Sequence, residues 1–310
     1  MSGPAELIIP EDILPDRADK VLAACSGHSR SSLARLMKLG LVRLQGREIR
    51  PSSILNPGDR LEIISEEAPE KRSEPEVPDF RIILEDEDVI VVDKPPGLVV
   101  HPGAGRPGNT LMDALIRTRP EMIGVGEPDR WGVVHRLDRD TSGVMVLVKN
   151  ANAHAALSAQ FKEHSVHRIY LAVVRGNPGD DSGTIDAAIG RHHKDRKRIS
   201  TATGKGRHAV TRWRVLQRLN GLALLEVTPE TGRTHQIRVH LASVGLPVAG
   251  DPVYGRLRKK GGIADPALLE ALKKLNRQAL HAAVLGFIHP RNAKYVEFSS
   301  RLPADIQALL

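Results

Sequence analysis

A polar segment between two short apolar runs places the strongest constraint on the fold of this chain. The runs are residues 132–134 and 144–148, and the segment between them holds one histidine, two arginines and two aspartates. Alternation and β-branching predict a strand for the second run, and Ser142 with Gly143 is interpreted as its turn. Functional residues concentrate on loops held between strands. The segment is therefore either part of a site or a charged surface turn in which Asp138 or Asp140 caps its own backbone.

Length and charge narrow the class of protein. A chain of 310 residues can form one sizeable core and a smaller module, and its net charge of +8 favours a polyanionic partner. The single cysteine, Cys25, excludes an intrachain disulfide and predicts a reducing compartment. The N-terminus lacks the basic region of a signal peptide, and no apolar run approaches the roughly 18 residues of a membrane span. We therefore expect a soluble, cytoplasmic protein that does not enter a membrane.

Composition divides the chain into three parts. Residues 15–65 carry nine basic and five acidic side chains, and they include a predicted helix with Leu33, Leu36 and Met37 on one face. Residues 66–79 carry six acids, two bases and three prolines, which is typical of an extended, flexible linker. Residues 80–310 are expected to form the second domain.

The pattern of residues 80–310 predicts an α+β domain with a mixed, mostly antiparallel sheet. Its expected strands are short and linked by turns rather than by crossover helices. Asn109 or Thr110 is expected to cap a helix that runs through Leu115. The other predicted elements are a strand pair over 81–93, helices over 152–162 and 266–276, and strands over 168–174, 221–228 and 277–290.

Two apparent ligand motifs are rejected, and one basic stretch is retained. Gly103, Gly105 and Gly108 form a GxGxxG pattern, but neighbouring prolines and the absence of a βαβ rhythm argue against a dinucleotide site. His235 and His240 are five residues apart, about 140° around a helix, so a zinc site on one helix face is not expected. Residues 191–218 hold ten bases and one acid, which predicts an RNA-facing segment.

Several motifs together resemble one known family. HRLDRDTSG at 135–143 is similar to the catalytic signature of the RluA/RluD-type RNA pseudouridine synthases, and KPPGLVVHPG, RIY, GRTHQ and RQALHAAVLGFIHP resemble further segments of that family in the same order. RADKVL, SRSSLARLMKLGLVRLQGREI and NPGDRLEI in residues 15–65 resemble the S4-type RNA-binding module. The resemblance thus runs from about residue 15 to residue 300.

The resemblance implies roles for individual residues. Asp138 is expected to be the essential carboxylate, Tyr170 to lie against the target base, and Arg233 of GRTHQ to pair with Asp138. Where the family carries K-x-Y, this chain has Arg168 before Tyr170. Arg136 is expected to fill the space left by the flipped uridine. The residues expected to bind RNA are Arg136, His135, Arg30, Arg35, Lys38, Arg43, Arg196, Lys197 and Arg198.

The implied reaction is the isomerisation of uridine to pseudouridine in RNA, without a cofactor or a metal. The carboxylate of Asp138 would either stabilise C1′ of the sugar or remove a sugar proton. The chain resembles the branch of this family that modifies large-subunit ribosomal RNA. We therefore expect 23S ribosomal RNA as its partner, free or within an assembling large subunit. We also expect the enzyme to be a monomer. Two alternatives stay open: a non-catalytic RNA-binding ribosome assembly factor, and an RNA N-glycosidase that releases uracil.

Overall fold

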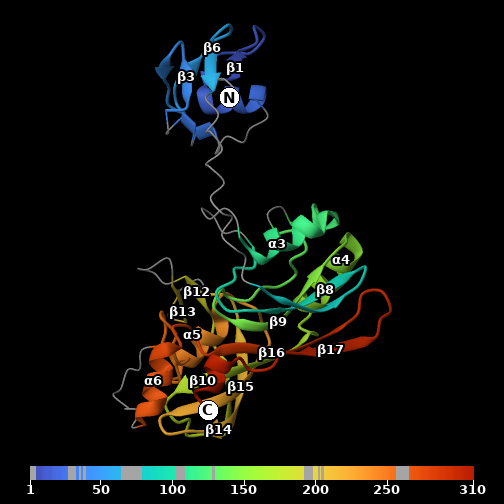
Figure 1. Cartoon of the computed structure of the whole chain (residues 1–310), viewed down its shortest axis with the longest axis vertical. Coiled ribbons are helices and arrows are strands. Elements are labelled where there is room, and N and C mark those ends of the chain that lie inside the picture. Colours follow the sequence, from blue (N-terminus) through green and yellow to red (C-terminus); the bar gives the residue numbers. More distant parts are fainter. Residues whose placement is uncertain are drawn as a thin grey trace. The chain divides into compact units, whose positions relative to one another are not determined.

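The chain divides into two compact units, residues 1–75 and residues 76–310. Figure 1 shows the elements of each unit in a computed structural model. The boundary after Pro75 falls within the segment 66–79 that composition predicts to be a linker. The structure describes residues 5–26, 33–34, 36–37, 40–63, 79–101, 109–127, 130–191, 198–201, 203, 206–255 and 265–310.

In the described part of the first unit, a small sheet and α1 share one apolar core. Its four-stranded sheet has the order β1-β6-β3-β4, and a separate two-stranded ladder joins β2 and β5. Leu22, Leu33 and Leu61 are fully buried in its core, as the predicted apolar helix face requires. The elements of this unit are β1 (Ala5–Ile8), β2 (Asp16–Arg17), α1 (Ala18–Ser26), β3 (Val42–Leu44), β4 (Arg47–Glu48), β5 (Ile54–Leu55) and β6 (Arg60–Ile63).

The start predicted for this unit, residue 15, is wrong. Residues Ala5 to Ile8 form β1, which pairs antiparallel with β6, so the unit begins at least ten residues earlier. The run AELI is too short for its alternation to predict a strand, and only its pairing with β6 reveals it. Three of the predicted RNA-binding residues of this unit, Arg30, Arg35 and Lys38, lie outside the described residues.

The second unit is built on one sheet, to which nine strands contribute among the described residues. Their order is β11-β14-β15-β10-β16-β9-β8-β7, with β17 also paired to β16. Among the described strands only β9 and β16 run parallel, so the predicted mixed, mostly antiparallel α+β fold is confirmed. The strands are β7 (Arg81–Glu85), β8 (Val89–Lys94), β9 (Ser142–Val148), β10 (His167–Arg175), β11 (Ser182–Asp186), β14 (Val210–Arg218), β15 (Leu222–Pro229), β16 (Leu280–Ile288) and β17 (Tyr295–Ser299). A short hairpin joins β12 (Gly190–Arg191) and β13 (Ile199–Ser200).

Both faces of the middle of the sheet are covered, which explains its apolar strands. Every residue of β9 is buried, and eight of the nine residues of β16 are buried or half-buried. The helices of the unit are α3 (Leu111–Thr118), α4 (Ala151–Lys162), α5 (Gln236–Ser243), α6 (Pro266–Lys274) and α7 (Ala304–Gln307), with a 3-10 turn over Pro120–Met122. In Figure 1, α4 lies beside β8 and β9, and α5 lies nearer β10.

The predicted turn at Ser142 and Gly143 is wrong, because both residues belong to β9. The more constrained of the two is Gly143. It lies inside β9 with φ of 116°, and a Cβ at this position would lie 2.1 Å from the carbonyl oxygen of Ala282 on β16. Glycine is therefore required because two parallel strands approach each other here. The approach holds the end of the polar segment 135–142 against β16.

Local signals predict the helix starts well. Thr110 rather than Asn109 caps α3 and forms a reciprocal capping box with Asp113. Asn150 caps α4 by accepting the N–H of Ala153. The predicted helix over 266–276 is present as α6, in which Leu268 and Leu272 are half-buried while Leu269 is 37% exposed. No helix among the described residues has the length and apolar character to cross a membrane.

Candidate active site

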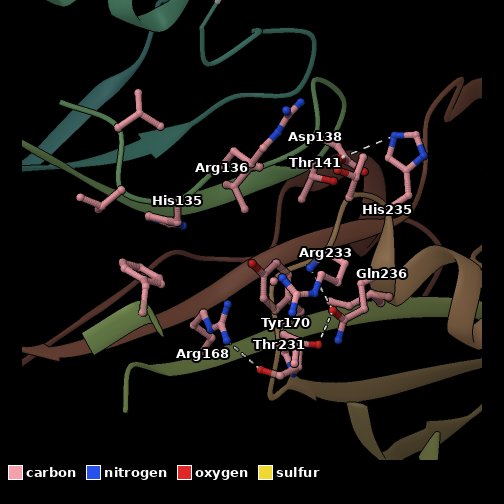
Figure 2. Close-up of a pocket in the computed structure, with 18 of the residues that line it drawn as sticks. His135, Arg136, Asp138, Thr141, Arg168, Tyr170, Thr231, Arg233, His235 and Gln236 are labelled. Carbon is pink, nitrogen blue, oxygen red and sulfur yellow. Dashed lines mark hydrogen bonds and ion pairs between the residues drawn. The ribbon is translucent and has the colours of Figure 1, made fainter. Parts of the chain in front are cut away.

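A cavity of about 600 Å³ opens in the second unit beside β10. Its walls come from the polar segment around Asp138, from α4, from β10 and from the turn at residues 229–238. Figure 2 shows Arg136 and Asp138 on one side of this cavity, with Arg168, Tyr170 and Arg233 facing them. Segments far apart in the sequence therefore meet in one site.

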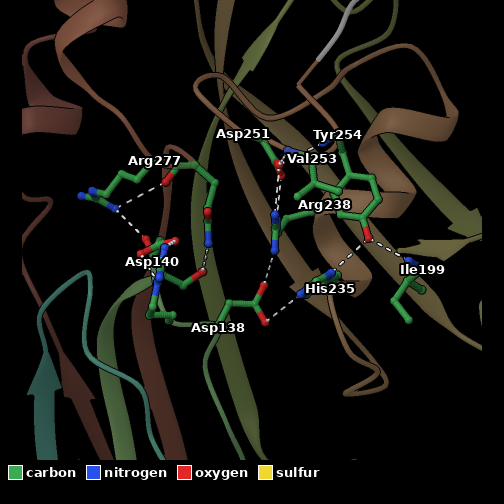
Figure 3. Close-up of polar contacts among 12 residues, drawn as sticks. Asp138, Asp140, Ile199, His235, Arg238, Asp251, Val253, Tyr254 and Arg277 are labelled. Carbon is green, nitrogen blue, oxygen red and sulfur yellow. Dashed lines mark hydrogen bonds and ion pairs between the residues drawn. The ribbon is translucent and has the colours of Figure 1, made fainter. Parts of the chain in front are cut away.

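The carboxylate of Asp138 is held by an arginine on α5. Nη1 of Arg238 lies 2.9 Å from Oδ2 of Asp138, and Nε and Nη2 of Arg238 make a bidentate pair with the buried Asp251 at 2.6 and 3.0 Å (Figure 3). Burial alone would lower the pKa of Arg238, but the hydrogen bonds and charges of Asp251 and Asp138 outweigh it and raise this pKa. Arg238 therefore stays charged and fixes the orientation of Asp138.

The prediction that Arg233 pairs with Asp138 is wrong. Arg233 precedes α5, and its Nε donates to the carbonyl oxygen of His208 at 3.3 Å. Arg238 instead projects from the first turn of α5, where Asp251 holds its guanidinium. Arg233 still lines the cavity, and burial followed by the charge of Arg207 lowers its pKa. The guanidinium groups of Arg233 and Arg207 thus lie near each other at the cavity wall.

His235 connects Asp138 to Tyr254. Nε2 of His235 lies 3.9 Å from Oδ1 of Asp138, and its Nδ1 lies 3.0 Å from the hydroxyl of Tyr254 (Figure 3). That hydroxyl accepts the N–H of Ile199 at 2.9 Å, so its own hydrogen is free to donate to Nδ1. Burial lowers the pKa of His235, which favours the neutral ring. We infer that the proton of neutral His235 sits on Nε2, toward Asp138.

Gln236 holds the turn that presents these side chains. Its Oε1 accepts from Thr231 Oγ1 and from the backbone N–H of Arg233, at 2.6 and 3.0 Å, and its Nε2 donates to Val210 O on β14 at 2.9 Å. His235 adopts φ of 55°, a left-handed conformation that costs a non-glycine residue energy unless its surroundings hold it. The motif GRTHQ therefore shapes the turn more than it supplies the arginine for Asp138.

Tyr170 packs against two apolar clusters of the second unit, one around β10 and β15 and the other around β8 and α3, and it lines the cavity. Burial raises the pKa of its hydroxyl, while the charge of Arg168 lowers it and that of Asp138 raises it. Tyr170 thus lies within electrostatic reach of both side chains.

The two residues before Leu137 differ in their contacts. His135 stacks on Phe161 with ring centroids 4.6 Å apart, and its Nε2 accepts the N–H of Val146 at 3.0 Å. Its predicted contact with RNA thus has to coexist with a role in holding β9. Arg136 is exposed on the cavity wall and makes no hydrogen bond or ion pair with any residue that the structure describes.

The rival carboxylate, Asp140, faces away from this chemistry. Arg139 pairs with it at 2.9 Å, and it does not line the cavity. Below the same loop, the fully buried Lys94 donates to the carbonyl oxygens of Pro95, Leu98 and Arg139 at 2.8 to 2.9 Å. Burial lowers the pKa of Lys94 to about 7, although three carbonyl acceptors match the three hydrogens of the charged form.

The remaining predicted RNA-binding residues are only partly described. Arg196 and Lys197 lie outside the described residues. Arg198 stacks over the ring of Tyr254 at 5.7 Å and donates to the carbonyl oxygen of Val253 at 3.4 Å. Arg43, in the first unit, lies on β3 and is half-buried.

Comparison with known proteins identifies the class to which this fold and this cavity belong. It is the class of the pseudouridine synthases. The sequence model of the family described as RNA pseudouridylate synthase matches residues 88–243, which contain Asp138, Tyr170 and Arg238. The chain belongs to this family. It is therefore an isomerase that converts uridine to pseudouridine in RNA.

Individual relatives agree over nearly the whole length. The chain is 41% identical to "Ribosomal large subunit pseudouridine synthase D" of Zymomonas mobilis over 98% of this chain and 96% of the relative. It is 40% identical to "Uncharacterized RNA pseudouridine synthase YlyB" of Bacillus subtilis over the same shares. Among solved structures, human RNA Pseudouridylate Synthase Domain Containing 1 matches with a TM-score of 0.55 and 28% identity, over 73% of this chain and 84% of that one.

The site residues that the sequence-based prediction misses include Arg238, Asp251 and Tyr254. Arg238 follows GRTHQ by only two residues, so a helix starting at Gln236 would have been the signal for it. Asp251 and Tyr254 carry no local signal, because their partners are 13 and 19 residues away along the chain.

Proposed function

We propose that this chain modifies uridines of large-subunit ribosomal RNA, with Asp138 as the catalytic carboxylate. The observation that carries the proposal is the ion pair of Asp138 with the buried Arg238 on the wall of the cavity. The name of the Zymomonas relative supports the ribosomal substrate, which in a bacterium is 23S RNA. Such a substrate would place the protein in the cytoplasm.

The reaction needs a carboxylate beside the sugar. The N1–C1′ bond breaks, the uracil turns while it remains bound, and C5 bonds to C1′. Asp138 either traps the electron-poor C1′ or removes a proton from the sugar, and both roles require the ionised form. Arg238 supplies the orientation and the positive charge that favour this form.

The other side chains of the cavity would bind and place the RNA. The target uridine has to leave its stack to enter a cavity of this kind. Arg136, exposed and without a partner among the described residues, is suited to fill the space that the uridine leaves. Tyr170 would lie against the base, and the adjacent guanidinium groups of Arg233 and Arg207 would contact phosphates.

The first unit is proposed to be an S4-type RNA-binding module. Its excess of basic residues and its motif resemblance support this role, with Arg30, Arg35, Lys38 and Arg43 as phosphate contacts. Arg196, Lys197 and Arg198 would extend the RNA contact beside the catalytic cavity. We further propose that the enzyme is a monomer and that its substrate is free 23S RNA or an assembling subunit.

Pseudouridine mapping tests the proposal. Large-subunit RNA from cells with and without the gene is mapped, and the deletion is complemented with wild type or with Asp138→Asn. We expect one or more pseudouridines that disappear in the deletion and return only with wild type. A map unchanged by the deletion would refute this substrate.

The same strains separate the alternatives. An assembly factor without catalysis would rescue subunit assembly with Asp138→Asn while no pseudouridine depends on the gene. An N-glycosidase would release free uracil from RNA in vitro, which chromatography detects. Free 23S RNA and isolated subunit precursors, compared as substrates of the purified enzyme, distinguish the two forms of the partner.

A further inference from the structure

Arg168 is a buried cation without a counter-ion. It is only 8% exposed, lies on β10 two residues before Tyr170, and lines the catalytic cavity. Nη2 donates to the carbonyl oxygens of Pro229 and Glu230 at 3.0 and 3.3 Å, while Nε has no hydrogen-bond partner. Within the described part of the chain, no carboxylate forms an ion pair with it.

This isolation is unusual within the molecule. Among the described residues, the other two arginines that are more than nine-tenths buried are Arg238 and Arg277, and each makes a bidentate pair with an aspartate. Nε of Arg43 and of Arg175 is also unpaired, but both residues are only half-buried. A buried charge without a partner destabilises the fold, and burial accordingly lowers the pKa of Arg168. Because this unpaired charge destabilises the fold and lies in the substrate cavity, we expect its partner to be a group of the bound substrate.

Nη1 is the donor of Arg168 that is left for the cavity, because Nη2 is bonded to carbonyl oxygens and the unpaired Nε is itself buried. The ring of Phe161 covers the guanidinium from one side, 5.8 Å from its carbon. Nη1 lies 3.3 Å from the position that a Cβ on Gly232 would occupy, so the missing side chain keeps this region open. Figure 2 shows Arg168 beside Tyr170 on the same side of the cavity, as residues i and i+2 of one strand should be.

We propose that Arg168 is a further catalytic residue, which binds a carbonyl oxygen of the uracil and stabilises the negative charge that the base acquires as it leaves the sugar. When the N1–C1′ bond breaks, its electron pair stays with the uracil and spreads over N1, O2 and O4. C1′ is left electron-poor and is met by Asp138. C5 then bonds to C1′, the C5 proton is lost, and N1 gains a proton, so the atoms balance as an isomerisation. This inference rests on the pseudouridine synthase activity.

The physical reason is that Arg168 has no competing anion. Arg238 is committed to two carboxylates, and its charge is already neutralised. An unpaired guanidinium in a site shielded from water interacts strongly with charge that develops during the reaction. Because uracil is neutral before the bond breaks, Arg168 stabilises the transition state more than the bound substrate.

The first test compares Arg168→Met with Arg175→Met in the full-length enzyme. Both arginines lie on β10 and have an unpaired Nε, but Arg175 does not line the cavity. In single-turnover reactions with saturating enzyme and uridine-containing RNA, we expect Arg168→Met to react about 10² to 10³ times more slowly, the range for removing one preorganised donor. Arg175→Met should react at the wild-type rate. RNA affinity should change less than the rate in Arg168→Met.

The second test varies the leaving group. Fluorine at C5 withdraws electrons and makes the uracil anion more stable, so RNA containing 5-fluorouridine depends less on Arg168. The reaction rate on both RNAs is measured after digestion as the loss of N1-linked nucleoside. The ratio of the wild-type rate to the Arg168→Met rate should therefore be smaller on 5-fluorouridine RNA than on uridine RNA. Equal ratios on both substrates, or a loss confined to RNA affinity, would overturn the proposal.

Two controls keep the outcome interpretable. If Arg168→Met does not fold, Arg168→Lys is compared on the same two substrates; it keeps the charge but loses the forked geometry. We expect a smaller defect than a neutral side chain would cause, again reduced on 5-fluorouridine RNA, and an equal ratio overturns the proposal here too. Wild type that fails to form pseudouridine at all would instead refute the activity itself.

Discussion

Nη1 of Arg238 donates to Oδ2 of Asp138 at 2.9 Å, across 100 residues of sequence. The same guanidinium is anchored by Asp251, whose side chain is completely buried. The position of the Asp138 carboxylate therefore depends on a buried pair behind it. This arrangement gives the first two predictions.

Asp138→Asn should keep the fold and RNA affinity but lose turnover, because an amide can neither trap C1′ nor take a sugar proton. Asp140→Asn is the matched control, since Asp140 pairs with Arg139 outside the cavity lining. Release of the C5 hydrogen of uridine measures turnover. A loss of less than tenfold in Asp138→Asn, about 1.4 kcal/mol of barrier, would contradict the assignment.

Arg238→Met should lower the free energy of unfolding and should also abolish turnover. It leaves the carboxylate of Asp251 buried without its cation, which costs on the order of 3–5 kcal/mol of unfolding free energy. Arg233→Met is the control, because within the described part of the chain the side chain of Arg233 bonds only the carbonyl oxygen of His208. Urea titration measures stability, and we expect Arg233→Met to lower RNA affinity without loss of stability. If instead Arg233→Met lost stability and turnover while Arg238→Met lost only RNA affinity, Arg233 would be the partner of Asp138.

Tyr254→Phe should lower turnover without removing RNA binding. The change deprives Nδ1 of His235 and the N–H of Ile199 of their shared partner, at a cost of about 1–3 kcal/mol for the unsatisfied groups. His235 can then move its proton from Nε2 to Nδ1, which alters the acid limb of the pH–rate profile. Tyr295→Phe, at an exposed tyrosine, is the control. Identical pH profiles for both variants would show that Tyr254 does not act through His235.

His135 should make stability fall in acid. Burial, then the charge of Arg168, lowers the pKa of His135 from 6.5 to about 3. Between these values the unfolded chain binds a proton that the folded protein does not, so the contribution is complete above about pH 6.5 and is lost toward pH 3. The loss is at most about 1.4 kcal/mol per pH unit.

Urea titrations at pH 7 and pH 5 measure this effect. His135→Gln keeps an acceptor for the N–H of Val146 but does not titrate. It should therefore lose less unfolding free energy than wild type between the two pH values. An equal loss in both proteins would mean that His135 titrates normally in the fold.

A chain that starts at Val77 tests the role of the first unit. The second unit, residues 76–310, contains the complete cavity, so we expect this chain to fold and to keep pseudouridine synthase activity. Affinity for structured ribosomal RNA should fall, because the basic side chains of the first unit no longer neutralise phosphates. The slope of log affinity against log salt should decrease by about 0.9 for each phosphate that the first unit neutralises, as for double helices. Equal slopes for the two chains would show that the first unit does not bind phosphates.

Much of the fold follows from local sequence signals. The cap at Thr110, the apolar runs of β8 and β9, and the turn between β7 and β8 depend on residues only a few positions apart. Local energetics therefore determines them, and they are predicted correctly. β1 and Gly143 are misjudged from sequence because their conformations depend on partner strands, β6 and β16, that are distant in the chain.

By itself, the sequence determined the α+β class, the family resemblance and the catalytic candidates Asp138 and Tyr170. Only the tertiary structure decided which arginine reaches Asp138, because GRTHQIR contains two arginines five residues apart. The left-handed His235 and the hydrogen bonds of Gln236 start α5 so that Arg238, not Arg233, points at the carboxylate. The unpaired charge of Arg168 is likewise invisible in sequence, since pairing and burial depend on which distant segments the fold brings together.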